Sequence, residues 1–139
     1  MTLALTKIAE SEFARRRAAQ RAALEGGHTT AEAANDNARL WLAIAAKAGA
    51  KLPEMEIDTL FPIGGKTWLQ WFDIADAGEL LAELARARDV ALASQIAHPQ
   101  DLARQQRALD LQALAIHLGA PAPTPETLRL PEHDERTAA

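Results

Sequence analysis

Two groups of carboxylates have the residue type and spacing that acid–base chemistry would use. They are Glu54, Glu56 and Asp58 in one segment, and Glu79 with Glu83 further along the chain. General acid–base catalysis needs carboxyl groups in a cleft that shifts their pKa values. The first group alternates along an expected loop, and Arg86 follows Glu83 at the spacing of a helical ion pair. We therefore expect solvated carboxylates with local ion pairs and no catalytic role.

The residues of nucleophilic and metal chemistry are sparse. The chain has no cysteine, which excludes thiolate chemistry and disulfides. Its serines, Ser11 and Ser94, do not lie in a nucleophile elbow. None of the histidines has the spacing of a metal site; they are His28, His98, His117 and His133. The sequence predicts no metal, no cofactor and no enzyme activity.

The segment Gly64-Gly65-Lys66-Thr67 is similar to the end of a phosphate-binding P-loop. A P-loop needs a glycine five positions before the glycine of its Gly-Lys-Thr end, and backbone amides that wrap the phosphates. Leu60 occupies that glycine position, and Pro62 has no amide hydrogen to donate. The segment is therefore interpreted as a turn followed by the start of a helix.

A cluster of arginines near the N-terminus suggests contact with nucleic acid. The cluster consists of Arg15, Arg16, Arg17 and Arg21. On a helix these side chains could contact phosphates and add salt-sensitive affinity. Glu10, Glu12 and Glu25 offset the charge, so a solvated helix face is the simpler interpretation. Nucleic-acid binding remains the alternative function.

Four of the six aromatic residues fall in one short segment, and they are Phe61, Trp68, Trp71 and Phe72. The last three have i, i+3 and i+4 spacing, which places them on one face of a short helix. Such a face either fills the core or docks on another protein, where tryptophan is a frequent hot spot. A homo-oligomer would bury the same residues between subunits. These four residues are the predicted protein-binding site.

The elements that would position these residues are helices. We expect a helix from Thr6 to about Leu24, ended by Gly26-Gly27, and one from Thr29 to about Ala48 with Thr29 and Glu32 as a capping box. The second helix could instead start after Asn35-Asp36-Asn37, because these residues compete with helical hydrogen bonding. Its expected buried stripe consists of Leu40, Trp41, Ile44, Ala45 and Ala48.

A third helix is expected from Asp76 to about Ile96. A further helix should begin in its first turn at Pro99 and end at Gly119. Residues 49–66 are expected to form a long connection, and residues 67–74 a short helix.

The composition agrees with an all-α fold. Alanine and leucine dominate the 48% hydrophobic fraction, whereas valine and tyrosine are nearly absent. We predict a compact bundle of four to five helices over residues 1–119, followed by a disordered, Pro-rich tail over residues 120–139. No apolar run is long enough to span a bilayer, and the N-terminus lacks the features of a secretory signal. A cytoplasmic protein with no membrane contact is expected.

The net charge of −4 is too small to indicate a nucleic-acid mimic or a strongly basic binder. The arginine-rich, alanine-rich composition suggests a bacterial source. The favoured function is therefore a small bacterial protein-interaction module. It would be a regulator, adaptor or inhibitor that occupies a partner's surface through the aromatic segment.

Overall fold

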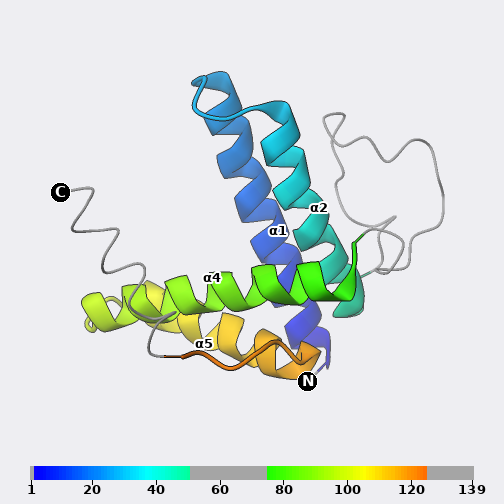
Figure 1. Ribbon diagram of the computed structural model, residues 1–139. Coiled ribbons are helices and arrows are strands. Elements are labelled where there is room, and N and C mark those ends of the chain that lie inside the picture. The colour runs from blue at the N-terminus through cyan, green and yellow to red at the C-terminus, as the bar shows by residue number, and fades with distance from the viewer. Residues whose placement is uncertain (1, 51–74, 125–139) are drawn as a thin grey trace. The chain divides into compact units, whose positions relative to one another are not determined.

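A computed structural model describes residues 2–50 and 75–124 of the chain. These residues form four helices, α1 (Thr2–Glu25), α2 (Ala31–Lys47), α4 (Ala77–Ala97) and α5 (Leu102–Leu118), and contain no strand. The predicted all-α helical fold is confirmed (Figure 1). No helix in this part of the chain combines the length and apolar character that a bilayer crossing requires.

Contacts divide the chain into two compact units, Met1–Leu80 and Leu81–Ala139. The first unit contains α1, α2 and the first residues of α4, and the second contains the rest of α4 and all of α5. The prediction of one helical domain over residues 1–119 with a tail over residues 120–139 stays a prediction.

Helices α1 and α2 lie side by side as an antiparallel hairpin (Figure 1). As predicted, glycine ends α1, and Gly27 has a φ of 73°, which suits a residue without a Cβ. The buried apolar side chains of this unit are mostly alanine, so the two helices can approach closely. They are Ala9, Phe13, Ala34, Ala38, Trp41, Leu42, Ala43, Ile44, Ala45, Ala48, Ala75 and Leu80.

The start of α2 differs from the prediction. Thr30 rather than Thr29 is the N-cap, and its side chain accepts a hydrogen bond from the Ala33 backbone N–H. Thr30 has the extended backbone of an N-cap, with φ −106° and ψ 156°, directly before the first helical residue Ala31. The predicted buried stripe of α2 is largely confirmed, although Leu40 is only half-buried and Leu42 is fully buried.

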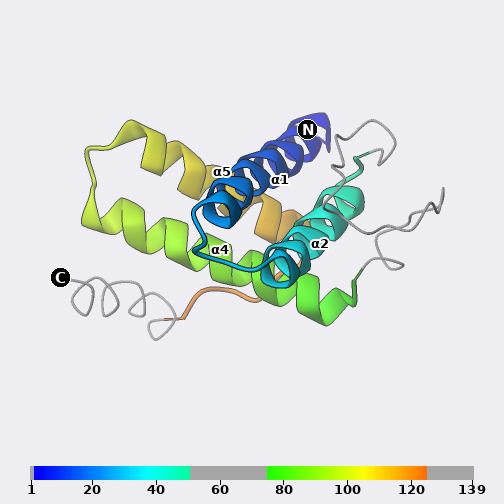
Figure 2. The same ribbon diagram turned by 90° about the horizontal axis from the view of Figure 1, so that it is seen from above.

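Helices α4 and α5 form the second hairpin, joined by a short turn at residues 98–101 (Figure 2). The predicted start of α5 at Pro99 is wrong, because Asp101 is its N-cap and accepts from the Arg104 backbone N–H. Its end at Gly119 is confirmed by a left-handed φ of 84°. Buried apolar residues of this unit are Leu84, Ala87, Ala91, Ala108, Leu111, Leu114, Ala115 and Leu118.

Several predictions fall outside the described residues. They are the connection over residues 51–66, the short helix over residues 67–74, and the part of the tail from residue 125 onward. Before that point the chain leaves α5 and meets α4 again, where the Pro121 carbonyl accepts a hydrogen bond from Arg88 Nη1.

Candidate protein-binding surface

Helix α5 has two apolar faces, and one of them is exposed. Its buried face consists of Ala108, Leu111, Leu114, Ala115 and Leu118. Leu102, Leu109 and Ile116 remain 76%, 59% and 75% exposed, among the few large apolar side chains in the described residues left in contact with solvent. Single exposed leucines are ordinary. These three residues share one face of the helix at intervals of about 10.5 Å along its axis, with mostly glutamines between them.

The spacing of these three residues aligns them closely. At about 100° per residue, Leu102 and Ile116 fall about 20° to either side of Leu109. The direction of Leu109 is opposite the centre of the buried face. We call the three residues Leu102, Leu109 and Ile116 the α5 stripe.

The residues that flank the α5 stripe are uncharged. Within about 60° of Leu109, the other residues of the helix are Gln105, Gln106, Gln112 and Ala113. The chain as a whole has 24% charged residues. The cores of protein–protein interfaces show the same depletion of charged residues.

Local hydrogen bonds cap both ends of α5 and stabilise the helix that carries the α5 stripe. The Arg104 backbone N–H donates to Asp101 Oδ1 at 3.2 Å, and this bond holds the pKa of the Asp101 carboxyl below its usual value of 3.8. At the other end, the Gly119 N–H donates to the Ala115 carbonyl. Near the middle, Gln106 Nε2 donates to Asp110 Oδ1 at 2.8 Å.

The predicted nucleic-acid-binding arginines do not form one common surface. The Arg17 side chain is buried, and it donates to Gln20 Oε1 at 3.1 Å and to Asn35 Oδ1 at 2.7 Å. Arg15 is half exposed and is paired with Glu12, and Arg21 is exposed with an interaction partner of its own.

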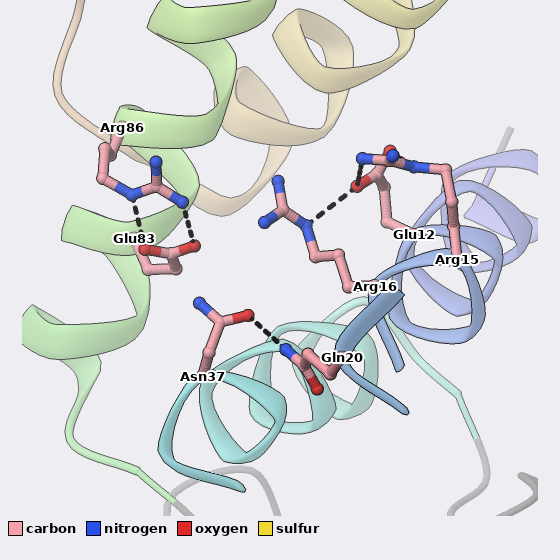
Figure 3. Close-up of polar contacts among 7 residues, drawn as sticks. All are labelled: Glu12, Arg15, Arg16, Gln20, Asn37, Glu83 and Arg86. Carbon is pink, nitrogen blue, oxygen red and sulfur yellow. Dashed lines mark hydrogen bonds and ion pairs between the residues drawn. The ribbon is translucent and has the colours of Figure 1, made fainter. Parts of the chain in front are cut away.

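Arg16 faces the second helix. Its guanidinium carbon lies 4.3 Å from the centroid of the buried Trp41 ring, within the range of a cation–π contact. Arg16 Nε also donates to Glu12 Oε2 at 3.0 Å (Figure 3). Both contacts use the guanidinium within the unit that contains α1 and α2.

The segment Asn35-Asp36-Asn37 connects α2 to α1 through side-chain hydrogen bonds. Asparagine competes with helical hydrogen bonds, which made this part of α2 a doubtful helix in the sequence. The structure places it inside α2, where Asn35 accepts from Arg17 and Asn37 Oδ1 accepts from Gln20 Nε2 at 2.9 Å (Figure 3). These side-chain bonds tie α1 to α2 along a polar seam.

The predicted protein-binding residues Phe61, Trp68, Trp71 and Phe72 lie outside the described residues. The carboxylates Glu54, Glu56 and Asp58 lie outside them as well. Their roles stay predictions.

Both carboxylates of the other pair form ion pairs, as expected, but Glu83 is not solvated as predicted, because its side chain is only 10% exposed. Glu83 accepts two hydrogen bonds from Arg86, at 2.8 and 2.7 Å (Figure 3). Glu79 accepts from Arg39 of α2 at 3.0 Å. In the part of the chain that the structure describes, no group of three potential metal ligands comes together.

One cluster brings together the residue types of a hydrolase triad. Ser94, His98 and Asp101 all contact Arg104 at the turn between α4 and α5. Arg104 Nη1 lies 2.8 Å from Ser94 Oγ and 2.6 Å from His98 Nδ1, so the arginine is the donor to both. A histidine that accepts from arginine in this way does not take a proton from serine through that nitrogen. The cluster is a turn-stabilising network.

Sequence reasoning missed the α5 stripe, although its signal was present. Leu102, Leu109 and Ile116 repeat every seven residues, which on a helix places them on one face. The same helix also carries the buried residues Leu111 and Leu118, which are likewise seven residues apart, so spacing alone does not show which set is exposed.

Comparisons with known protein families, with curated proteins and with solved structures found no match to this chain.

Proposed function

We propose that this protein is a small bacterial, cytoplasmic protein-interaction module, a regulator, adaptor or inhibitor that acts by occupying a partner's surface. The observation that supports this function is the exposed α5 stripe with its uncharged flanks. The helix is held at both ends by caps, so the stripe is presented on a rigid element. Recognition through one apolar helix face uses residues at this kind of spacing.

The contribution of the α5 stripe to the free energy of binding can be estimated from the apolar area that a partner would bury. Complete burial of a leucine or isoleucine side chain contributes about 1.5–3 kcal/mol. The three residues of the α5 stripe are mostly but not fully exposed, so each should contribute about 1–2 kcal/mol to binding. Loss of one of them should weaken binding about tenfold.

The aromatic segment would be a second contact element of the same module. Phe61, Trp68, Trp71 and Phe72 carry four of the six aromatic side chains of the chain. The other two, Phe13 and Trp41, are buried with α1 and α2. If the segment binds a partner, Trp68→Ala with Trp71→Ala should abolish binding and leave the melting temperature and helical circular dichroism unchanged. Unfolding of the double variant would assign these residues to the core instead.

The proposal is tested by affinity capture from a bacterial lysate with Leu109→Lys and with Ile96→Lys as the matched control. Ile96 is also a large apolar residue, 68% exposed, but it lies on α4 and outside the α5 stripe. The capture is run after chemical crosslinking in the lysate, so that weak complexes are retained. We expect a discrete protein, which can be the untagged chain itself, to be captured by the wild type and by the control. Leu109→Lys should lose it.

Nuclease treatment distinguishes the alternative. Capture that survives nuclease and disappears with Leu109→Lys supports the module. Capture that disappears with nuclease, and that Leu109→Lys does not affect, would overturn it in favour of the arginines of α1.

A further inference from the structure

The apolar residues of the α5 stripe are spaced symmetrically about its central residue. Leu109 lies in its centre, and Leu102 and Ile116 lie seven residues before and after it. The flanking glutamines on one edge, Gln105 and Gln112, are also placed almost symmetrically about Leu109. If two copies of α5 were related by a two-fold axis at the level of Leu109, each apolar residue of one stripe would face an apolar residue of the other. Each of these glutamines would likewise lie close to a glutamine of the other copy.

We propose that the occupant of the α5 stripe is a second copy of this chain, bound through α5 in an antiparallel arrangement with a two-fold axis at Leu109. This inference rests on the proposed function and names its partner. In this dimer, Leu109 packs against the Leu109 of the other copy. Leu102 packs against the Ile116 of the other copy. A symmetric dimer uses the same patch on both copies, which this spacing satisfies.

The flanking glutamines can form hydrogen bonds with the same glutamines of a second copy. A side-chain amide has both donors and an acceptor, so two glutamines can bond to each other, whereas two lysines or two carboxylates repel. In the antiparallel arrangement Gln105 lies beside the Gln112 of the other copy. Gln105 Nε2 already donates to the Pro99 carbonyl at 2.5 Å, so its Oε1 would accept from that Gln112.

The charge pattern also suits a second copy. Identical surfaces bring identical charges near each other, and the face within about 60° of Leu109 has none. Asp110 is about 100° from Leu109, at the edge of this face, and its carboxylate accepts from Gln106. Antiparallel packing also opposes the two helix dipoles, whereas parallel packing aligns them.

A contact made by one helix from each copy is smaller than a standard stable interface. We therefore expect a weak dimer that dissociates on dilution. Because the contact is apolar, added salt should not weaken it.

The register can be tested by crosslinking, because the chain has no cysteine of its own. Single variants Leu109→Cys, Leu102→Cys, Ile116→Cys and Ile96→Cys are purified as full chains and treated with a short bismaleimide. Circular dichroism confirms that each is folded. We expect Leu109→Cys to form crosslinked dimers about tenfold faster than Ile96→Cys, because pairing raises the effective concentration of the thiols.

The other variants determine the orientation. In the antiparallel dimer, Leu102 lies about 21 Å along the axis from the Leu102 of the other copy, beyond the reach of a short linker. Leu102→Cys alone should therefore not crosslink, but a mixture of Leu102→Cys and Ile116→Cys should. Crosslinking of Leu102→Cys with itself would indicate a parallel pair and would overturn the proposed arrangement.

Failure of the dimer is separable from failure of the proposed function. If no variant of the α5 stripe crosslinks faster than Ile96→Cys, a second copy is not the partner. If Leu109→Lys nevertheless loses a different protein captured from lysate, the interaction module stands and only its self-pairing is overturned. If the crosslinks and the capture are both absent, both proposals fall.

Discussion

At the scale of single residues, one hydroxyl links the two helices of the first unit. Thr6 Oγ1 of α1 donates to the Ala48 carbonyl at the end of α2 at 2.6 Å, and the bond is buried. A helix end leaves carbonyls without helical partners, and an unsatisfied buried carbonyl is costly.

Replacement of Thr6 by valine keeps the side-chain shape and removes this donor. We expect Thr6→Val to lower the free energy of unfolding by about 1–3 kcal/mol, because the Ala48 carbonyl loses its buried partner. Urea denaturation measures the loss. Thr6→Ser keeps the hydroxyl and should lose less, and an equal loss in both variants would assign the effect to packing.

A buried ion pair in α4 should contribute more to stability than an exposed one. Arg88 and Asp89 are 3% and 6% exposed, with Arg88 Nη2 2.8 Å from Asp89 Oδ1. Arg88→Met would leave a buried carboxylate without its partner and should cost about 3–5 kcal/mol. Arg39→Met removes an arginine whose partners Asp36 and Glu79 have side chains that are 65% and 54% exposed, and it should cost at most about 1 kcal/mol. Similar losses in urea denaturation would show that the Arg88 pair is effectively solvated.

The pH dependence of stability has a contribution from Asp101. Its folded-state pKa is lowered, first of all by the Arg104 backbone N–H, from a usual value of 3.8. A depressed carboxylate pKa stabilises the folded state above the unfolded-state pKa, and this stabilisation is lost as pH falls through the folded-state pKa.

Asp101→Asn keeps an N-cap side chain but does not titrate. At neutral pH the wild type should melt at the higher temperature. The difference should shrink as pH falls below about 4 and vanish below the folded-state pKa of Asp101. Thermal melts of the two proteins over this range give the comparison. A difference that stays constant down to low pH would show that the charge of Asp101 does not contribute.

At the scale of elements, the α5 stripe should matter for binding and hardly at all for folding. Leucine and lysine have similar helix propensities, and Leu109 points to solvent. Leu109→Lys should therefore change the free energy of unfolding by less than about 0.5 kcal/mol. Leu111→Lys, two residues away on the buried face, should unfold the hairpin. Chemical denaturation of both variants tests this assignment of faces.

The helices show which features a sequence can determine. Gly27 and Gly119 end helices because the left-handed backbone there suits glycine, and this local rule predicted both ends. Nothing local distinguishes Leu109 from Leu111, since both suit a helix. Which of them is buried depends on the neighbour against which α5 packs. For the same reason, the sequence does not separate the exposed Arg86 from the buried Arg88.

Two local signals, Pro99 and Asp101, compete to set the start of α5. Pro99 suits a first helical turn, but Asp101 has the side chain that bonds the free N–H of Arg104. The cap determined where the helix begins.

At the scale of the whole molecule, composition was enough to predict an all-α fold, because leucine and alanine favour helices. The division into Met1–Leu80 and Leu81–Ala139 was not predicted, since it depends on contacts between residues distant in the sequence. For a similar reason, the structure indicates a different candidate binding surface, the α5 stripe, from the aromatic residues that the sequence predicted. The aromatic content of residues 61–72 is visible in the sequence, whereas the exposure of α5 is a property of the packed hairpin.

The measurement that tests the account most directly is photo-crosslinking in living bacterial cells. A photo-reactive amino acid replaces Leu109 in one strain and Ile96 in another, so that whatever covers each position is captured in place. We predict a discrete crosslinked species at Leu109, either a dimer of this chain or a complex with one other protein, and none at Ile96. The absence of a discrete species at Leu109, or the same species at both positions, would contradict the assignment of the α5 stripe as the binding surface.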